Sequence, residues 1–140
     1  MSSTRGCGMR IHRFALTLIL LGLAWASIGR AIWAWTDRDF LIRYSAQPGW
    51  EYLLVTGVIW ALLVLSAAGL TLSGKPRWFR IAFFEIVLWA GLYWVDVLFF
   101  SRSGEALLNL GFLVVLTLVG LLYAAFVLEM IPAILSRFRR

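Results

Sequence analysis

The segment Trp50–Leu72 reads WEYLLVTGVIWALLVLSAAGLTL and decides the fold class of this chain. Its only charged residue is Glu51, at the start of the segment. A helix needs about 20 apolar residues to cross the hydrocarbon core of a bilayer, which is about 30 Å thick, and this segment meets that length. Its apolar residues lie on all sides of a helix, whereas a surface helix of a soluble protein has one apolar stripe. The segment therefore predicts a transmembrane helix.

Three further segments have the same character, and turn-forming residues separate them. They are Phe14–Trp35, Ile81–Phe100 and Ala106–Ile131. Breakers occur at residues 47–49, 73–76 and 101–104, where Gly, Pro and Ser gather. The later two connections are short, so the neighbouring helices should be antiparallel. We predict an all-α protein: an integral membrane four-helix transmembrane bundle with spans at 14–35, 50–72, 81–100 and 106–131.

The composition supports this prediction and excludes other classes. Of 140 residues, 62% are hydrophobic and 14% are charged. Soluble domains are about half apolar and about a quarter charged, so a water-soluble enzyme is not expected. Intrinsic disorder is excluded because it requires few apolar residues. Cys7 is the sole cysteine, so an intrachain disulfide and a CxxC pair are excluded as well.

The basic residues predict the orientation of the chain in the membrane. Nine lie on one predicted side and three on the other; the nine are Arg5, Arg10, Arg13, Lys75, Arg77, Arg80, Arg137, Arg139 and Arg140, and the three are Arg38, Arg43 and Arg102. The positive-inside rule then makes both termini cytoplasmic, as basic tails 1–13 and 132–140, with an outer interfacial loop at 36–49 containing one or two helical turns. We expect a multi-pass protein of the cell (plasma or bacterial inner) membrane.

The first span has a second interpretation, because Ala24-Trp25-Ala26 before Ser27 resembles a signal-peptide cleavage site. Apolar and aromatic residues continue through Trp35, which favours a retained transmembrane helix.

Charges at membrane depth are the residues that could carry chemistry, since they are costly in hydrocarbon. Matching their depths predicts a cluster of Arg30, Asp96 and Asn109 near the outer side, and pairing of Glu129 with Arg77 and Arg80 at the cytoplasmic edge. Glu85 has the least obvious partner; Arg80, Arg13 or Lys75 could reach it. Glu85 and Asp96 share one helix face about 16 Å apart, too far for a carboxylate dyad, but suited to a relay or to a structural role.

No motif for catalysis or metal binding is evident in the sequence. His12 is the only histidine, which excludes a bis-histidine haem site within this chain, and no Ser/His/Asp set or metal-spaced Cys/His cluster occurs. We therefore expect no catalytic residues, no metal and no cofactor bound by this chain alone, with contact to lipid or quinone left open. The small-residue pairs Gly22/Ala26, Gly57/Ala61, Gly69/Ser73 and Gly120/Ala124 predict close helix contacts.

Three functions are compatible with this reading. The first is a non-enzymatic accessory or scaffold subunit of a larger membrane complex, for which respiratory or photosynthetic electron-transfer assemblies are the natural hosts. The second is an oligomeric transporter or proton/ion channel that uses the Glu85–Asp96 face, and the third is an intramembrane enzyme acting on lipid or quinone. The expected partners are membrane lipids and other integral membrane subunits or further copies of this chain. A nucleic-acid partner is not expected, because the net charge of +6 is split into small clusters between apolar segments.

Overall fold

The computed structural model describes residues 3–44, 48–100 and 110–131, and these residues form helices and no strand. The helices are α1 (Ser3–Thr36), α2 (Arg38–Arg43), α3 (Trp50–Leu72), α4 (Pro76–Phe100) and α6 (Leu110–Val127). All except α2 are long and apolar enough to cross a membrane. The predicted all-helical membrane protein with four spans is therefore confirmed, and the chain is a multi-pass membrane protein.

The helix bounds differ from the predicted spans where local chemistry extends or stops a helix. α3 matches its predicted span at both ends. α4 begins earlier, at Pro76, because proline lacks the N–H that the first turn of a helix leaves unpaired. α6 ends at Val127, before the predicted end at 131, because the chain turns at Glu129, whose φ of 59° is left-handed. Residues 106–109 of the fourth predicted span lie outside the described residues.

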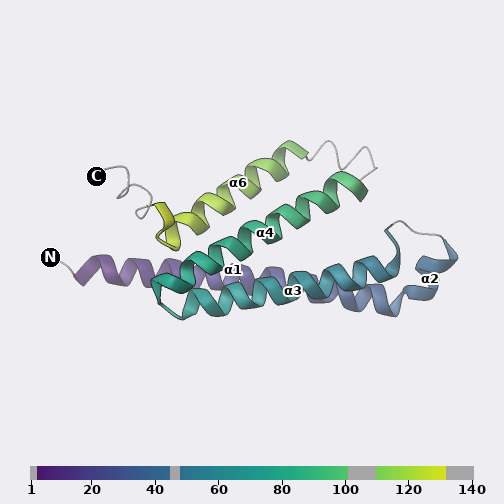
Figure 1. The fold of residues 1–140 in the computed structure, drawn as a ribbon, viewed down its shortest axis with the longest axis horizontal. Coiled ribbons are helices and arrows are strands. Elements are labelled where there is room, and N and C mark those ends of the chain that lie inside the picture. Colours follow the sequence, from purple (N-terminus) through teal and green to yellow (C-terminus); the bar gives the residue numbers. More distant parts are fainter. Residues whose placement is uncertain (1–2, 45–47, 101–109, 132–140) are drawn as a thin grey trace.

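The four long helices alternate in direction, as Figure 1 shows. α1 and α3 lie side by side along most of their length, α4 packs obliquely against α3, and α6 contacts both α1 and α4. The start of α1, the α3–α4 turn and the end of α6 share one end of the molecule, while α2 lies at the other. We call the first the α3–α4 end and the second the α2 end. Arg10, Arg13 and Lys75 thus belong to one end, and Arg38 and Arg43 to the other.

A glycine sets the close approach of α1 and α3. A Cβ added at Gly57 would lie 3.0 Å from Ala31 Cβ and 3.0 Å from the Ser27 carbonyl oxygen. Ala61, one turn further along α3, is also buried. Of the four predicted small-residue pairs, Gly57/Ala61 alone has both members buried; added Cβ atoms at Gly22, Gly69 and Gly120 would meet nothing within 4 Å.

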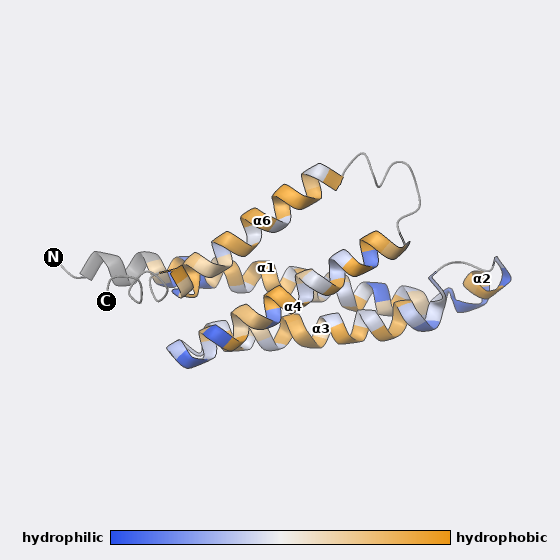
Figure 2. Cartoon of the chain, turned by 45° about the horizontal axis from the view of Figure 1, so that its top comes forward, coloured by the Kyte–Doolittle hydropathy of each residue, from blue (hydrophilic) through white to orange (hydrophobic). Residues whose placement is uncertain are grey.

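α6 packs far less tightly than α1 and α3. Ala124 and Val127, both near the end of the helix, are its only buried residues. Figure 2 shows α6 to be hydrophobic along its length, whereas hydrophilic residues gather at α2 and at the start of α4. Large apolar side chains such as Phe112, Val115 and Leu122 are exposed on α6, as is typical of surfaces that face lipid or another membrane helix.

Candidate functional site

Asp96 joins three helices toward the α2 end of the molecule. Arg30 Nη1 of α1 lies 2.7 Å from Asp96 Oδ2, and the Tyr52 hydroxyl of α3 donates a hydrogen bond of 2.6 Å to Asp96 Oδ1. Asp96 is only 9% exposed. Both oxygens of a buried carboxylate are therefore bound, which compensates for the cost of removing its charge from water.

Arg30 has a second contact in this cluster. Its guanidinium carbon lies 4.6 Å from the centre of the Trp60 ring, which is the geometry of a cation–π interaction. The structure thus brings together Arg30 and Asp96 as depth matching predicts, and it adds Tyr52 and Trp60, which the sequence analysis does not connect to the pair. Asn109, the third predicted member, lies outside the described residues.

Glu129 has a different partner from the one predicted. Arg13 Nη2 lies 2.6 Å from Glu129 Oε1, and the Arg13 guanidinium also lies over the Phe79 ring, 4.5 Å from its centre. Arg77 and Arg80 are exposed and, among the described residues, form no ion pair with Glu129. The physical reason is that the end of α6 packs against α1, so Arg13 of α1 faces the turn at Glu129.

Glu85 differs from these two carboxylates because no basic residue in the described part of the chain forms an ion pair with it. Its Oε2 lies 2.9 Å from the Ser66 hydroxyl, which is also 2.9 Å from the Leu63 carbonyl oxygen. A hydroxyl donates one proton, so the two oxygens compete for it. Of its predicted partners, Arg13 is bound to Glu129, and Lys75 and Arg80 are exposed.

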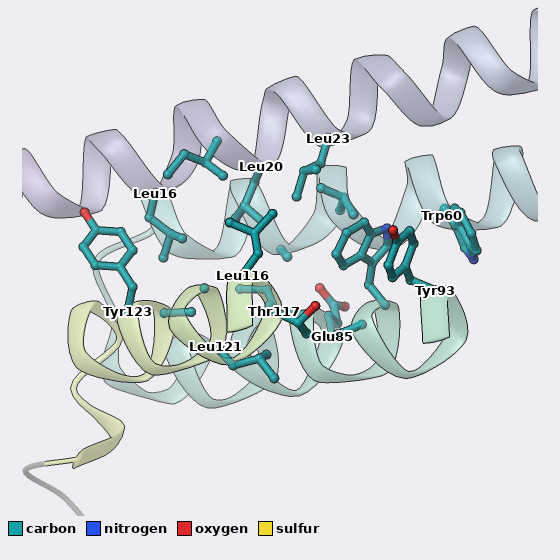
Figure 3. Close-up of a pocket in the computed structure, with 18 of the residues that line it drawn as sticks. Leu16, Leu20, Leu23, Trp60, Glu85, Tyr93, Leu116, Thr117, Leu121 and Tyr123 are labelled. Atoms are coloured by element: carbon teal, nitrogen blue, oxygen red, sulfur yellow. The ribbon is translucent and has the colours of Figure 1, made fainter. Parts of the chain in front are cut away.

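Glu85 lies on the wall of a cavity of about 630 Å³ between α1, α3, α4 and α6. Figure 3 shows Leu16, Leu20 and Leu23 projecting from α1 toward the side on which Glu85, Thr117 and Tyr93 lie. The wall is almost entirely apolar. Residues that line it include Leu16, Leu20, Leu23, Trp60, Val64, Ala67, Glu85, Ile86, Trp89, Tyr93, Leu113, Leu116, Thr117, Gly120 and Tyr123.

Three aromatic rings line the same cavity as Glu85. Trp89 and Tyr93 follow Glu85 at intervals of four residues on α4, which places all three on one face. The Trp89 and Tyr93 rings are stacked, with centres 5.7 Å apart, and Trp60 of α3 lies 6.4 Å from Trp89 and 6.3 Å from Tyr93. Trp89 and Tyr93 lie between Glu85 and Asp96 along α4.

Some polar atoms of the cavity wall are hydrogen-bonded within the protein, and one buried donor is not. The Ser27 and Thr117 hydroxyls donate to carbonyl oxygens of their own helices, and Thr117 also accepts a long hydrogen bond from the Trp94 indole. The indole N–H of Trp89 is buried and has no hydrogen-bond partner among the described residues. Such a donor normally finds an acceptor, which makes this atom a natural contact for a bound molecule.

The sequence analysis did not predict the cavity. The signal that was available was the spacing of Glu85, Trp89 and Tyr93, which puts an acidic and two aromatic side chains on one helix face. The opposing wall from α1 and α6 could not be inferred, because it depends on the tilt of α6. The described residues contain no group of three or more His, Cys, Asp or Glu that could hold a metal ion.

Comparisons of this chain with protein-family models, with curated proteins and with solved structures find no match.

Proposed function

We propose that this chain binds a hydrophobic, membrane-dissolved molecule in the cavity between α1, α3, α4 and α6. The observation that carries the proposal is the cavity itself, of about 630 Å³ and lined by apolar and aromatic side chains with few polar groups. Ligand sites are commonly of this kind and fall within about 300–1,000 Å³. The Glu85 carboxylate and the unpartnered Trp89 N–H on the wall favour an amphiphile over a pure hydrocarbon.

The proposal is for a binding protein without a catalytic site of its own. Among the described residues that line the cavity, Glu85 is the only carboxylate. The lining hydroxyl that lies beside a base is that of Tyr123, which is 3.3 Å from His12 Nδ1. A proton or ion pathway along the Glu85–Asp96 face has less support, because both oxygens of Asp96 are bound and aromatic rings lie between the two carboxylates.

A saturable probe tests the binding function. The neutral fluorophore 1-aminoanthracene, titrated into protein in phosphatidylcholine nanodiscs, should show saturable enhancement above that of empty nanodiscs. Gly120→Leu should weaken binding about tenfold or more, equivalent to about 1.4 kcal/mol, because Gly120 lines the cavity and has open space at its Cβ.

The matched control is Gly111→Leu, the same change on the same helix. Gly111 also has open space at its Cβ, but it does not line the cavity, so binding should be unchanged. Absence of saturable binding by the unmodified protein, or equal loss in both variants, would contradict the proposal.

A role as an accessory subunit is a second candidate, favoured by the sparse packing of α6. Its exposed face, with Phe112, Val115 and Leu122, suits a helix of another integral membrane subunit. Purification from native membranes in mild detergent should then recover other subunits in fixed stoichiometry, and electron-transfer assemblies are the host class to test first. Recovery of this chain alone or only as a homo-oligomer would exclude such a subunit role.

We also propose a plasma-membrane (in a bacterium, inner-membrane) location with both termini cytoplasmic. The supporting observation is that Arg10, Arg13, Lys75, Arg77 and Arg80 belong to the same end of the molecule. The positive-inside rule assigns that end to the cytoplasm.

A further inference from the structure

Glu85 and Asp96 of α4 and Glu129, just after α6, are three carboxylates that are not equivalent. Asp96 is paired with Arg30 and Glu129 with Arg13, at 2.7 Å and 2.6 Å. Glu85, which lies nearer the middle of α4 than Asp96 does, is half-buried, and its hydrogen-bond partner among the described residues is the Ser66 hydroxyl. Asp96 and Glu129 each have a cationic partner within the protein. Glu85 has no such partner in the described part of the chain.

We propose that the missing cation belongs to the ligand, and that the cavity binds amphiphiles whose polar end is an ammonium group. This inference rests on the proposed binding function and specifies its ligand class. An ionised carboxylate in an apolar setting is stabilised by an opposite charge, and a bound ammonium group would supply it.

The aromatic rings beside Glu85 support the same class of ligand. A cation is attracted to the face of an aromatic ring, and aromatic cages are a common means of binding quaternary ammonium groups. The protein already uses this contact for its own cations, since Arg30 lies over Trp60 and Arg13 over Phe79. Trp89 and Tyr93 line the cavity on the same face of α4 as Glu85, and neither ring has a cation of the described chain over it.

The apolar remainder of the wall suits the rest of such a molecule. Leu16, Leu20 and Leu23 of α1 face the α4 and α6 side of the cavity, so a hydrocarbon chain can lie against them while the charged end meets Glu85 (Figure 3). A ligand that satisfies both parts has one cationic end and one apolar chain.

Competition among three molecules with the same tail tests the inference. Decyltrimethylammonium, 1-decanol and decyl sulfate would each displace 1-aminoanthracene from the protein in phosphatidylcholine nanodiscs, whose zwitterionic surface favours neither sign of charge. Decyltrimethylammonium should compete at about one tenth of the concentration that 1-decanol needs, and decyl sulfate should be the weakest.

Substitution of the carboxylate gives the decisive comparison. Glu85→Gln should raise the concentration of decyltrimethylammonium needed for displacement about tenfold and leave that of 1-decanol unchanged. Glu51→Gln, at an exposed position at the start of α3, should change neither. Trp89→Leu should weaken competition by the ammonium more than by the alcohol, since it removes the ring and keeps an apolar side chain.

The possible failures are distinct. If 1-aminoanthracene binds but the ammonium competes no better than 1-decanol, or if Glu85→Gln leaves its competition unchanged, the inference about the cation is overturned and the binding function stands. If 1-aminoanthracene shows no saturable binding, the binding function itself is overturned.

Discussion

Arg30 Nη1 and Asp96 Oδ2 lie 2.7 Å apart, so a cation on α1 meets a carboxylate on α4 between apolar helices. Tyr52 adds a hydrogen bond from α3 to the other oxygen of the same carboxylate. Asp96 thus connects three of the four long helices, and removing its side chain leaves a half-buried arginine without its partner.

Asp96→Ala should therefore destabilise the fold far more than Glu129→Ala. Loss of one member of a buried ion pair costs about 3–5 kcal/mol, whereas an exposed pair contributes about 1 kcal/mol or less. Asp96 is buried, while the Glu129 side chain is 42% exposed. Unfolding in detergent micelles, followed by circular dichroism, measures the difference. Equal loss of stability in the two variants would show that the Asp96 cluster does not anchor the helices.

Tyr52→Phe isolates a single bond of this cluster. The change keeps the ring and removes the donor to Asp96 Oδ1, so the free energy of unfolding should fall by about 1–3 kcal/mol. Tyr44→Phe is the matched control, because Tyr44 is exposed beyond the end of α2, and it should have no measurable effect. A loss in the control as large as that in Tyr52→Phe would argue that the hydrogen bond is not its cause.

Gly57→Ala should weaken the packing of α1 against α3, although alanine is the better helix former. The new Cβ would lie 3.0 Å from backbone and side-chain atoms of α1, so the helices must separate, at a cost of about 1–3 kcal/mol. Gly69→Ala on the same helix meets nothing within 4 Å and should be neutral or stabilising. Thermal unfolding in one detergent compares the two, and a more stable Gly57→Ala protein would contradict the close contact.

The first helix should be retained in the mature protein. Cleavage after Ala26 would remove Leu16, Leu20 and Ala24, all buried in the core that α1 forms with its neighbours. Intact-mass spectrometry of protein purified from membranes should therefore give a mass that includes the residues before Ala26. A mature chain that begins at Ser27 would show that the rest of the core forms without them.

Cys7 provides a test of orientation, because it is the only cysteine. A membrane-impermeant maleimide should not label it in intact cells and should label it in inverted vesicles, if the N-terminus is cytoplasmic. The control is Asp39→Cys in a Cys7→Ser background, since Asp39 is exposed in α2 at the opposite end of the molecule. Labelling of Cys7 in intact cells together with protection of the cysteine at position 39 would reverse the proposed orientation.

The depth of each residue in the membrane was predictable from the sequence, and this depth explains why the contact between Arg30 and Asp96 was predicted. Counting residues from the ends of each span puts Arg30 and Asp96 at one level, and the structure brings them into contact. Depth alone does not tell which side of a helix faces which neighbour. The sequence therefore did not connect Tyr52 with this pair, and Glu129 was predicted to pair with Arg77 and Arg80 in place of Arg13.

The number, order and approximate positions of the membrane-crossing helices follow from the sequence, because the length and hydrophobicity of a segment are local properties. The α2 turns between the first two spans also follow from local composition. Three features depend on how the helices pack and could not be predicted from local sequence. α1 and α3 approach closely at Gly57, α6 has few buried residues, and a cavity lies between the four helices. The tilt and rotation of each helix depend on side chains from other helices. For this reason the sequence alone does not tell that Glu85 faces a cavity and Asp96 faces an arginine.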